Sequence, residues 1–335
     1  MAYISFQPND YFNTVLWTTD GTGNKALTTG HSTDMVWIKF RDYAYDHRIY
    51  DDVRGVTKKI IPNKTDAEST TTDLASFDTN GFTVGSNLNT SGEGGLVGWS
   101  WKANGQGSSN SDGSDSSTVS ANTTAGFSIV KWTPSGGNAT VGHGLGAVPE
   151  MIISFRIDGA QDRFVYHKDI GNTKYVRLNQ TTASTTDANA WNNTTPTSSV
   201  FSVGSQFGGS DYIAYCFAEK KGFSKFGSYV GNGSTDGSFI YTGFKPAFVM
   251  IKSTGTEGWY IIDNKRTGFN EANYALIAQD TSAEETGTNR INFLSNGFKA
   301  TTSNSAVNTS GNTYIFMAFA EEPLVSSNGV PNTAR

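Results

Sequence analysis

The sequence repeats one order of short apolar runs three times, and this repetition constrains the fold more than any single motif does. Three runs rich in Val and Ile can be laid over one another: MVWIKF from Met35, MIISFR from Met151 and FVMIKS from Phe248. Short, nearly continuous apolar runs of this kind are typical of buried β-strands. Aromatic strand starts precede them by 23, 24 and 25 residues, at Phe12, Phe127 and Phe223.

A further apolar run closes each unit and alternates as a pleated strand does. These runs are LVGWSWK from Leu96, YIAYCFAE from Tyr212 and YIFMAFAE from Tyr314. One face of each strand carries large side chains, namely Val97, Trp99 and Trp101, then Ile213, Tyr215 and Phe217, then Ile315, Met317 and Phe319. The other face is smaller or more mixed. Since alternate residues point to opposite faces, one face packs a core and the other lies against a close neighbour, which favours a sandwich of two sheets.

The repeats divide the chain into three units, at residues 1–104, 125–221 and 222–322. The pairs Asn80-Gly81 and Asn296-Gly297 each sit between alternating segments and predict tight hairpins. Residues 105–124, GQGSSNSDGSDSSTVSANTT, have the composition of a flexible linker with nothing to bury. Residues 323–335 read as a coil-like tail. The predicted fold is therefore all-β, with three tandem β-sandwich repeats.

Composition narrows the classes of partner and compartment. The net charge is −5 and no Lys/Arg cluster occurs, which argues against nucleic acid as a main partner. Cys216 is the only cysteine, so no intrachain disulfide framework and no zinc site built on several thiolates can form. No run approaches ~18 apolar residues, and the first residues lack the features of a signal peptide. We therefore expect no membrane insertion and assembly in a reducing cytoplasm.

One charged motif recurs at the end of a strand. RIYDDVRG in unit one aligns with IIDNKRTG in unit three, which places Asp51 with Asp263 and Arg54 with Arg266. Unit two has VYHKDIG there, so both charges are replaced together. A carboxylate and a guanidinium three residues apart can bracket a turn through a charge-assisted bond, and losing one partner alone would strand a charge. We interpret Asp51, Arg54, Asp263 and Arg266 as two structural ion pairs; a ligand-binding or catalytic role is the less favoured alternative.

Other candidate motifs fail on context. GTGNKA at 21–26 nominally matches a dinucleotide fingerprint, but no helix follows it, and its counterparts are glycine-rich turns. The four histidines show no metal-ligand spacing. Adjacent acids such as Glu284 and Glu285 point apart on an extended chain, whereas a glycosidase needs two carboxylates facing each other. The sequence thus predicts no catalytic residue, no cofactor and no metal, and a protein that is not an enzyme.

Trp191 is the most informative aromatic residue for binding, because it lies in the polar segment DANAWNNTTPTSS. A tryptophan in such a loop can be a platform on which a sugar stacks. It can equally be a hydrophobic plug beneath its own loop. We take Trp191 as the candidate glycan contact and keep the plug as the alternative.

Several segments together resemble a known family. They are residues 214–252, the segments FLSNGFK and NTYIFMAFAEEP, and the ending NGVPNTAR. The chain resembles a repeated domain of unknown function that occurs in structural, tail fibre-like proteins of marine tailed bacteriophages. That resemblance implies a lectin-like or jelly-roll-like β-sandwich in a virion protein and supplies no catalytic residue. Unit one departs from it, since Thr33 replaces the proline found at Pro149 and Pro246 before the buried strand.

These observations set the functional expectation. We expect a virion structural protein, a tail fibre or tail-tip component that is assembled in the cytoplasm of a host bacterium and contacts host-surface polysaccharide. Tandem weak sites would suit multivalent attachment. We further expect contacts with other virion proteins and a homo-oligomer, a trimer or another symmetric assembly, because virion positions impose rotational symmetry. The alternatives are a capsid-decorating protein and, less favoured, a polysaccharide depolymerase.

Overall fold

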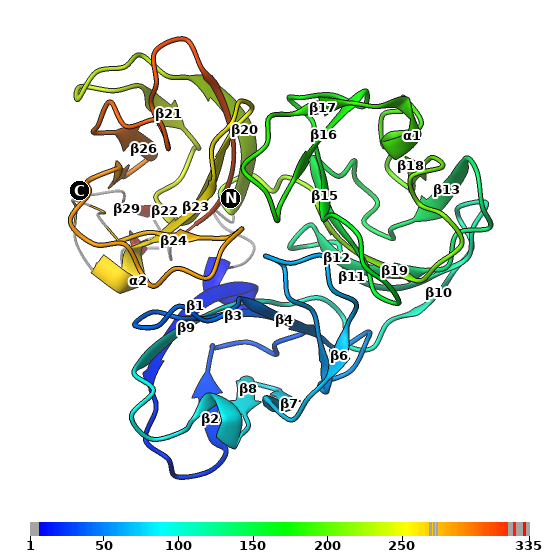
Figure 1. Cartoon of the computed structure of the whole chain (residues 1–335), viewed down its shortest axis with the longest axis horizontal. Helices are drawn as coiled ribbons and strands as arrows, with labels where there is room; N and C mark the ends of the chain where they lie inside the picture. Colours follow the sequence, from blue (N-terminus) through cyan, green and yellow to red (C-terminus); the bar gives the residue numbers. More distant parts are fainter. Residues whose placement is uncertain are drawn as a thin grey trace.

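The structure is a computed structural model that describes residues 7–320 apart from 268, 269, 271 and 273, together with the short paired strands β28 (Leu324–Val325) and β29 (Pro331–Asn332). Its regular structure is almost entirely β-strand. Three lobes surround a common centre, formed by residues 7–104, 105–221 and 222–320 (Figure 1). No helix in the described part of the chain is long and apolar enough to cross a membrane.

Lobe one contains a main sheet and a smaller outer sheet. The main sheet has the order β1 (Phe12–Thr18), β9 (Gly95–Trp101), β3 (Met35–Phe40) and β4 (Arg48–Asp51). The outer sheet has the order β2 (Lys25–Thr28), β8 (Gly81–Val84) and β7 (Leu74–Asp78). The remaining elements are the strand pair β5 (Lys58–Lys59) and β6 (Ser69–Thr70) and the 3-10 helices η1 (Pro8–Asp10) and η2 (Ser86–Leu88).

Lobe two has a longer main sheet. Its order is β10 (Ser108–Asn110), β11 (Ser117–Asn122), β12 (Phe127–Trp132), β19 (Tyr212–Phe217), β14 (Met151–Arg156), β15 (Phe164–His167), β16 (Lys174–Arg177) and β17 (Thr185–Thr186). The outer sheet pairs β13 (Ala139–Gly142) with β18 (Val200–Val203), and the short helix α1 spans Ala188–Trp191.

Lobe three again has two sheets. The main sheet has the order β20 (Ser224–Val230), β27 (Thr313–Ala320), β22 (Pro246–Ser253), β23 (Trp259–Asp263) and β24 (Leu276–Ile277). The outer sheet has the order β21 (Phe239–Tyr241), β26 (Gly297–Ala300) and β25 (Ile291–Leu294), and the short helix α2 spans Asn264–Thr267.

The closing strand of each lobe lies between its opening strand and its buried apolar run. Antiparallel pairing places the last large residue of the closing strand opposite the first residue of that run: Trp101 with Met35, Phe217 with Met151 and Phe319 with Phe248. Fully apolar strands suit a sheet that is covered on both faces. All six residues of β3 and all eight of β22 are buried.

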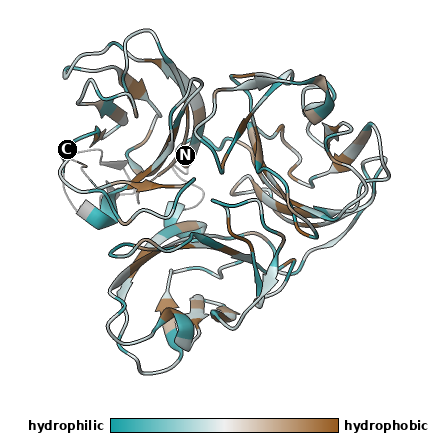
Figure 2. Cartoon of the chain, in the orientation of Figure 1, coloured by the Kyte–Doolittle hydropathy of each residue, from teal (hydrophilic) through white to brown (hydrophobic). Residues whose placement is uncertain are grey.

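The large-residue faces of the closing strands turn toward one core that the three lobes share. This central core contains all nine residues named above for those faces, and the strands that surround the centre are strongly hydrophobic (Figure 2). Trp101, Phe217 and Phe319 meet there, with ring centroids 5.8 to 6.4 Å apart. The three lobes are therefore parts of one packed body, which the sequence did not reveal.

The opposite faces of the main sheets pack against the outer sheets and form a separate core in each lobe. In lobe one, Val36 and Leu96 of the main sheet meet Phe82 and Val84 of the outer sheet. Gly98 leaves room for this contact, since a Cβ there would lie 3.1 Å from the Phe82 ring. Each main sheet is thus buried on both faces.

The prediction of a flexible linker at 105–124 is wrong. Strands β10 and β11 in this segment extend the main sheet of lobe two, where β11 pairs with β12. Val119 of β11 is buried in the lobe core, and the buried Ser117 hydroxyl donates to the Gly142 carbonyl at 3.0 Å. Small polar residues can form a strand when the sheet satisfies their hydrogen bonds. Most of the predicted coil-like tail, 323–335, lies outside the described residues, apart from β28 and β29.

Candidate functional site

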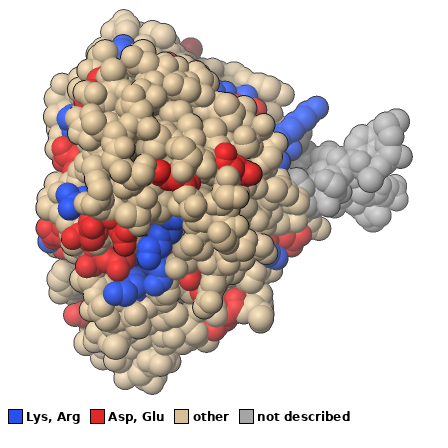
Figure 3. All heavy atoms as spheres, turned by 90° about the vertical axis from the view of Figure 1, so that its right-hand side faces the viewer, with Lys and Arg blue, Asp and Glu red and all other residues tan. Residues whose placement is uncertain are grey.

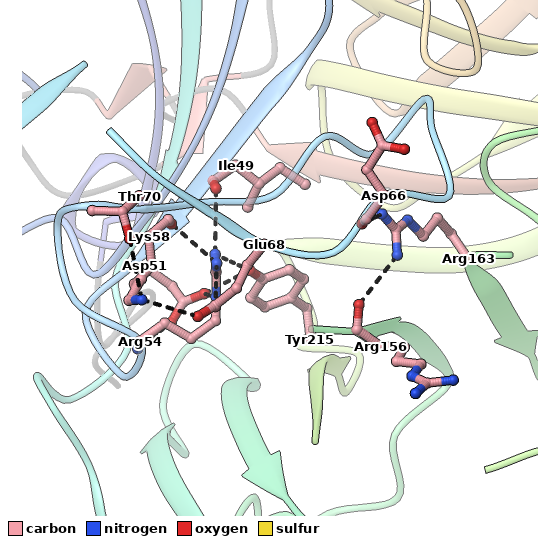
Figure 4. A network of polar contacts seen from close by, with 10 residues as sticks. All are labelled: Ile49, Asp51, Arg54, Lys58, Asp66, Glu68, Thr70, Arg156, Arg163 and Tyr215. Atoms are coloured by element: carbon pink, nitrogen blue, oxygen red, sulfur yellow. Dashed lines mark hydrogen bonds and ion pairs between the residues drawn. The ribbon is translucent and has the colours of Figure 1, made fainter. Parts of the chain in front are cut away.

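Both predicted ion pairs are formed, and both are fully buried. In lobe one, Arg54 Nε donates to Asp51 Oδ2 at 2.6 Å, and the Arg54 backbone N–H donates to Asp51 Oδ1 at 2.9 Å (Figure 4). In lobe three, Arg266 makes the same two bonds to Asp263, at 2.7 and 3.0 Å. These four side chains are at most 1% exposed. Each carboxylate therefore brackets the turn that follows β4 or β23.

Each carboxylate also accepts a hydrogen bond from a neighbouring lobe. Tyr215 of β19 donates its hydroxyl to Asp51 Oδ2 at 2.7 Å, so lobe two is joined to lobe one. Trp99 of β9 donates its indole N–H to Asp263 Oδ2 at 3.0 Å, so lobe one is joined to lobe three. Trp99 and Tyr215 are the middle large residues of their closing strands. The ion pairs therefore sit at the junctions between lobes.

His167 occupies the aspartate position in lobe two and completes the circle. Its Nε2 lies 3.2 Å from the Phe316 carbonyl of β27, and its Nδ1 accepts from the Asp169 backbone N–H at 3.2 Å. This pattern fits the neutral imidazole, with the proton on Nε2. Burial lowers the pKa of His167 to about 4. Lobe three is thus joined to lobe two by a neutral hydrogen bond where the other two junctions use a charged pair.

The remaining donors of Arg54 reach nearby carbonyl oxygens. Its Nη1 donates to the Lys58 carbonyl at 3.0 Å and its Nη2 to the Ile49 carbonyl at 3.3 Å. Burial alone would lower the pKa of Arg54, but Asp51 and other nearby groups raise it above its ordinary value. Burial and the Asp51 charge hold the pKa of Tyr215 well above its ordinary value, so its hydroxyl stays a donor.

A loop of each lobe reaches the end of a main-sheet strand in the next lobe. The Glu68 N–H donates to the Ile157 carbonyl at 2.9 Å, and the Glu284 N–H donates to the Arg41 carbonyl at 2.7 Å. At the third junction, the Ser184 N–H donates to the Thr254 carbonyl at 2.8 Å. Arg41, Ile157 and Thr254 directly follow β3, β14 and β22.

The side chain of Glu284 adds charge to one of these joints. It accepts from Arg41 Nη2 at 2.8 Å and from Arg266 Nη1 at 2.9 Å. One carboxylate therefore connects the buried pair of lobe three with a cation of lobe one.

Three buried cations cap the same strand ends, and sequence reasoning missed all of them. Lys39 Nζ donates to the Phe40 carbonyl at 2.8 Å, and Lys252 Nζ donates to the Ser253 carbonyl at 2.6 Å. In lobe two, Arg163 Nη1 reaches the Arg156 carbonyl at 3.3 Å (Figure 4). The signal for the lysines was available, because each is the only charge within an otherwise apolar run. Arg163 gave none, since it comes from a neighbouring segment.

Burial shifts the pKa values of these cations downward. The pKa falls to about 8 for Lys39 and Lys252, and to about 10 for Arg163. All three side chains are fully buried. Carbonyl oxygens therefore hold charges that the low-dielectric interior disfavours.

The chemistry of this network is that of a joint. Asp51, Arg54, Asp263 and Arg266 are inaccessible to a ligand, and their partners belong to the protein itself. Within the described residues, no group of three or more His, Cys, Asp and Glu side chains is arranged to hold a metal ion. The arrangement can hold lobes in register, and it presents no reactive group to a substrate.

The prediction of Trp191 as a glycan platform is wrong. Trp191 is 1% exposed and packs against Tyr166 and Phe207, with centroids 5.8 and 5.5 Å away. Asp187 caps α1 by accepting the Asn189 N–H at 2.8 Å, and the helix then directs Trp191 into the core of lobe two. The alternative, a hydrophobic plug beneath its loop, is what the structure shows.

The exposed aromatic residues lie elsewhere. Within the described residues, those at least 36% exposed are Tyr43, Tyr45, Phe239 and Tyr241. Tyr43 and Tyr45 lie in the loop between β3 and β4, with rings 5.9 Å apart. Phe239 and Tyr241 are the two ends of β21. The sequence gave no sign of this exposure, because both pairs follow the alternation or turn composition of ordinary strands and loops.

Comparison with known families decides the classification. The family model described as "Domain of unknown function (DUF7483)" matches residues 7–323. The chain belongs to this family. The DUF7483 match runs across all three lobes, which agrees with their shared core. No match was found among curated proteins or among solved structures.

The surface of this DUF7483 protein mixes both signs of charge. On the face drawn in Figure 3, acidic and basic side chains lie close together, and broad areas carry neither. The surface pairs include Arg156 with Asp158 and Lys168 with Glu150, both 2.9 Å long. Binding at such a surface depends on local contacts more than on long-range attraction.

Proposed function

We propose that this DUF7483 chain is a structural protein of a bacteriophage particle, placed on the virion surface as a tail fibre or tail-tip component that contacts host-surface glycan. The resemblance to tail fibre-like proteins motivates the virion assignment. The observation that carries glycan contact is the pair of exposed tyrosines, Tyr43 and Tyr45, on a body whose other aromatic residues mostly lie in cores. Lobes locked by buried joints would give such a contact a rigid support.

We infer that the three lobes are copies of one β-sandwich unit. The main sheets share the order opening strand, closing strand, buried run and following strand, as in β1-β9-β3-β4, β12-β19-β14-β15 and β20-β27-β22-β23. The strand-end cations and the joints between lobes recur in the same way. The jelly-roll-like connectivity and lectin likeness remain predictions from the family resemblance.

Tyr43 and Tyr45 have the composition of a weak sugar site. Aromatic faces can stack on the apolar face of a sugar ring while their hydroxyls stay in water. Two acids flank them: Asp42, which accepts the Gly95 N–H at 2.6 Å, and Asp46, which pairs with Lys64 at 2.6 Å. Carboxylates held in place can accept sugar hydroxyl bonds. Many copies on one particle would raise the overall affinity through avidity.

Binding of the purified protein to host-envelope polysaccharide tests the glycan contact. The double variant Tyr43→Ala/Tyr45→Ala should bind at least tenfold more weakly and keep its melting temperature, because both rings are substantially exposed. Val148→Ala, an exposed apolar position in lobe two, is the control and should bind normally. Unchanged binding by the tyrosine variant would reject this site.

Gold-labelled antibody on intact particles tests the location. We expect label at the tail. Label confined to the capsid faces would replace the tail assignment with a capsid-decorating role. Release of reducing ends from the polysaccharide by the purified protein would instead favour a depolymerase.

A further inference from the structure

The outer sheets of the three lobes share one edge, and each lobe treats it differently. The edge strands are β2, β13 and β21. Their buried middle residues pair with a phenylalanine of the next strand: Leu27 with Phe82, Val141 with Phe201 and Ile240 with Phe298. These pairs make Ala26, Thr140 and Phe239 equivalent, and likewise Thr28, Gly142 and Tyr241. An open edge offers unpaired backbone groups to another strand.

In lobe two the chain covers this edge itself. The Asp115 N–H donates to the Thr140 carbonyl at 3.0 Å, and Ser117 Oγ donates to the Gly142 carbonyl at 3.0 Å. Asp115 also forms a parallel bridge with Val141. The two carbonyl oxygens that face outward from β13 are therefore both occupied, by the segment that connects lobes one and two.

In lobe one the same edge is polar and protected. Ala26 and Thr28 are small, and Lys25 at the start of β2 pairs with Asp20 at 2.6 Å. A charged residue and small side chains on an edge strand discourage pairing with another chain.

In lobe three the edge is apolar and open. Phe239 is 48% exposed and Tyr241 is 64% exposed. They point to the same outer face, because they are two residues apart on one strand. Within the described residues, β21 pairs only with β26. This edge has the two features that the others lack: large apolar side chains and no covering segment.

The backbone of β21 is oriented for pairing at this edge. The Ala300 N–H donates to the Ser238 carbonyl, and the Thr242 N–H donates to the Asn296 carbonyl. Residues 238 and 242 thus point their polar groups at β26. By the alternation of an antiparallel ladder, Phe239 and Tyr241 direct theirs to the open edge.

We propose that β21 pairs antiparallel with β21 of a second copy of this chain, about a twofold axis at Ile240. Phe239 then lies opposite Tyr241 of the other copy, and each such pair exchanges two main-chain hydrogen bonds. The match is self-complementary, as a twofold interface requires. It places an aromatic pair on the outer face twice, an arrangement that stabilises antiparallel strands. The two outer sheets become one six-stranded sheet.

The contact is small, so the dimer is weak. A stable interface buries about 1,600 Å² in total, and this one rests on three-residue strands. We expect a dissociation constant on the order of 10–100 µM. Copies held close together on one particle would associate more strongly.

Sedimentation of the full chain across a concentration series tests the dimer. The variant Phe239→Ala/Tyr241→Thr, which installs the lobe-one residues, should weaken association at least tenfold. Ala26→Lys, at the equivalent edge of lobe one, should leave it unchanged. A wild-type chain that stays monomeric at several hundred micromolar, or a double variant that dimerises normally, would overturn the proposal.

Cross-linking tests the register. In an equal mixture of the single variants F239C and Y241C, the antiparallel register brings the new thiols of two copies opposite each other. Either variant alone keeps its like thiols apart. The native thiol is fully buried and does not compete. We expect at least fivefold more disulfide-linked dimer in the mixture than in either variant alone, and equal yields would reject the register. Dimerisation that depends on a different face, or edge binding only by another protein's extended segment, would also count against self-pairing.

Discussion

Asp51 and Arg54 show how one pair of residues serves two purposes. The carboxylate closes a local turn through the Arg54 backbone and side chain, and it accepts the Tyr215 hydroxyl from the next lobe. The local half was predictable from a three-residue spacing and from the joint loss of both charges in unit two. The partner in the next lobe was not, because 164 residues separate Tyr215 from Asp51, and no sequence spacing encodes such a contact.

A double-mutant cycle measures this coupling. Asp51→Asn and Arg54→Met should each lower the free energy of unfolding by about 3–5 kcal/mol, because each leaves an unpaired buried partner. The double variant should lose clearly less than the sum of the two. Arg156→Met breaks a surface pair whose side chains are 34% and 44% exposed, and should cost under about 1 kcal/mol. Denaturant titration gives all four values, and strict additivity would show that the two residues act independently.

Strands were the most predictable elements of this fold. The apolar runs became β3, β14 and β22, and the alternating runs became β9, β19 and β27. The Asn-Gly pairs became the turns of the β7–β8 and β25–β26 hairpins. Strand β11 escaped prediction because polar Ser and Thr residues surround its single large apolar residue, Val119. Composition alone cannot show that a neighbouring sheet edge will satisfy such a segment.

Gly113 gives a test of the segment that covers β13. A Cβ at this position would lie 2.3 Å from the Thr140 carbonyl oxygen, so Gly113→Val should push the segment off the edge. Amide hydrogen exchange at residues 108–117 should then speed up at least tenfold, while the core strand β19 stays protected. Gly208→Ala is the matched control, since nothing lies within 4 Å of its Cβ. Fast exchange at 108–117 in the unmodified protein would mean that the segment is loose after all.

The whole molecule is built around the central core, and this was the least predictable level. Periodicity showed that Trp101, Phe217 and Phe319 belong to a buried face. It could not show that the burying surfaces are the other two lobes, because alternation reports burial without naming a partner. The sequence therefore suggested three separate domains, whereas the structure has one interior with three outer cores.

This architecture predicts a single unfolding transition. Calorimetry should give one peak whose calorimetric and van't Hoff enthalpies agree, and residues 125–221 produced alone should not fold, since their half of the central core would face water. Phe217→Ala should destabilise the entire chain by about 3–5 kcal/mol, while the exposed Val148→Ala should leave the peak in place. Separate transitions for the lobes would contradict a shared core.

The circle of joints between lobes has a mechanical consequence. Lobes one and two, and lobes two and three, are connected by the polypeptide as well as by side chains. Lobes three and one are connected only by contacts such as those of Glu284 with Arg41 and of Trp99 with Asp263. Under tension the body would therefore open like a clasp at this one seam. Lobes that had parted there would stay tethered, and the clasp could close again once the load was removed.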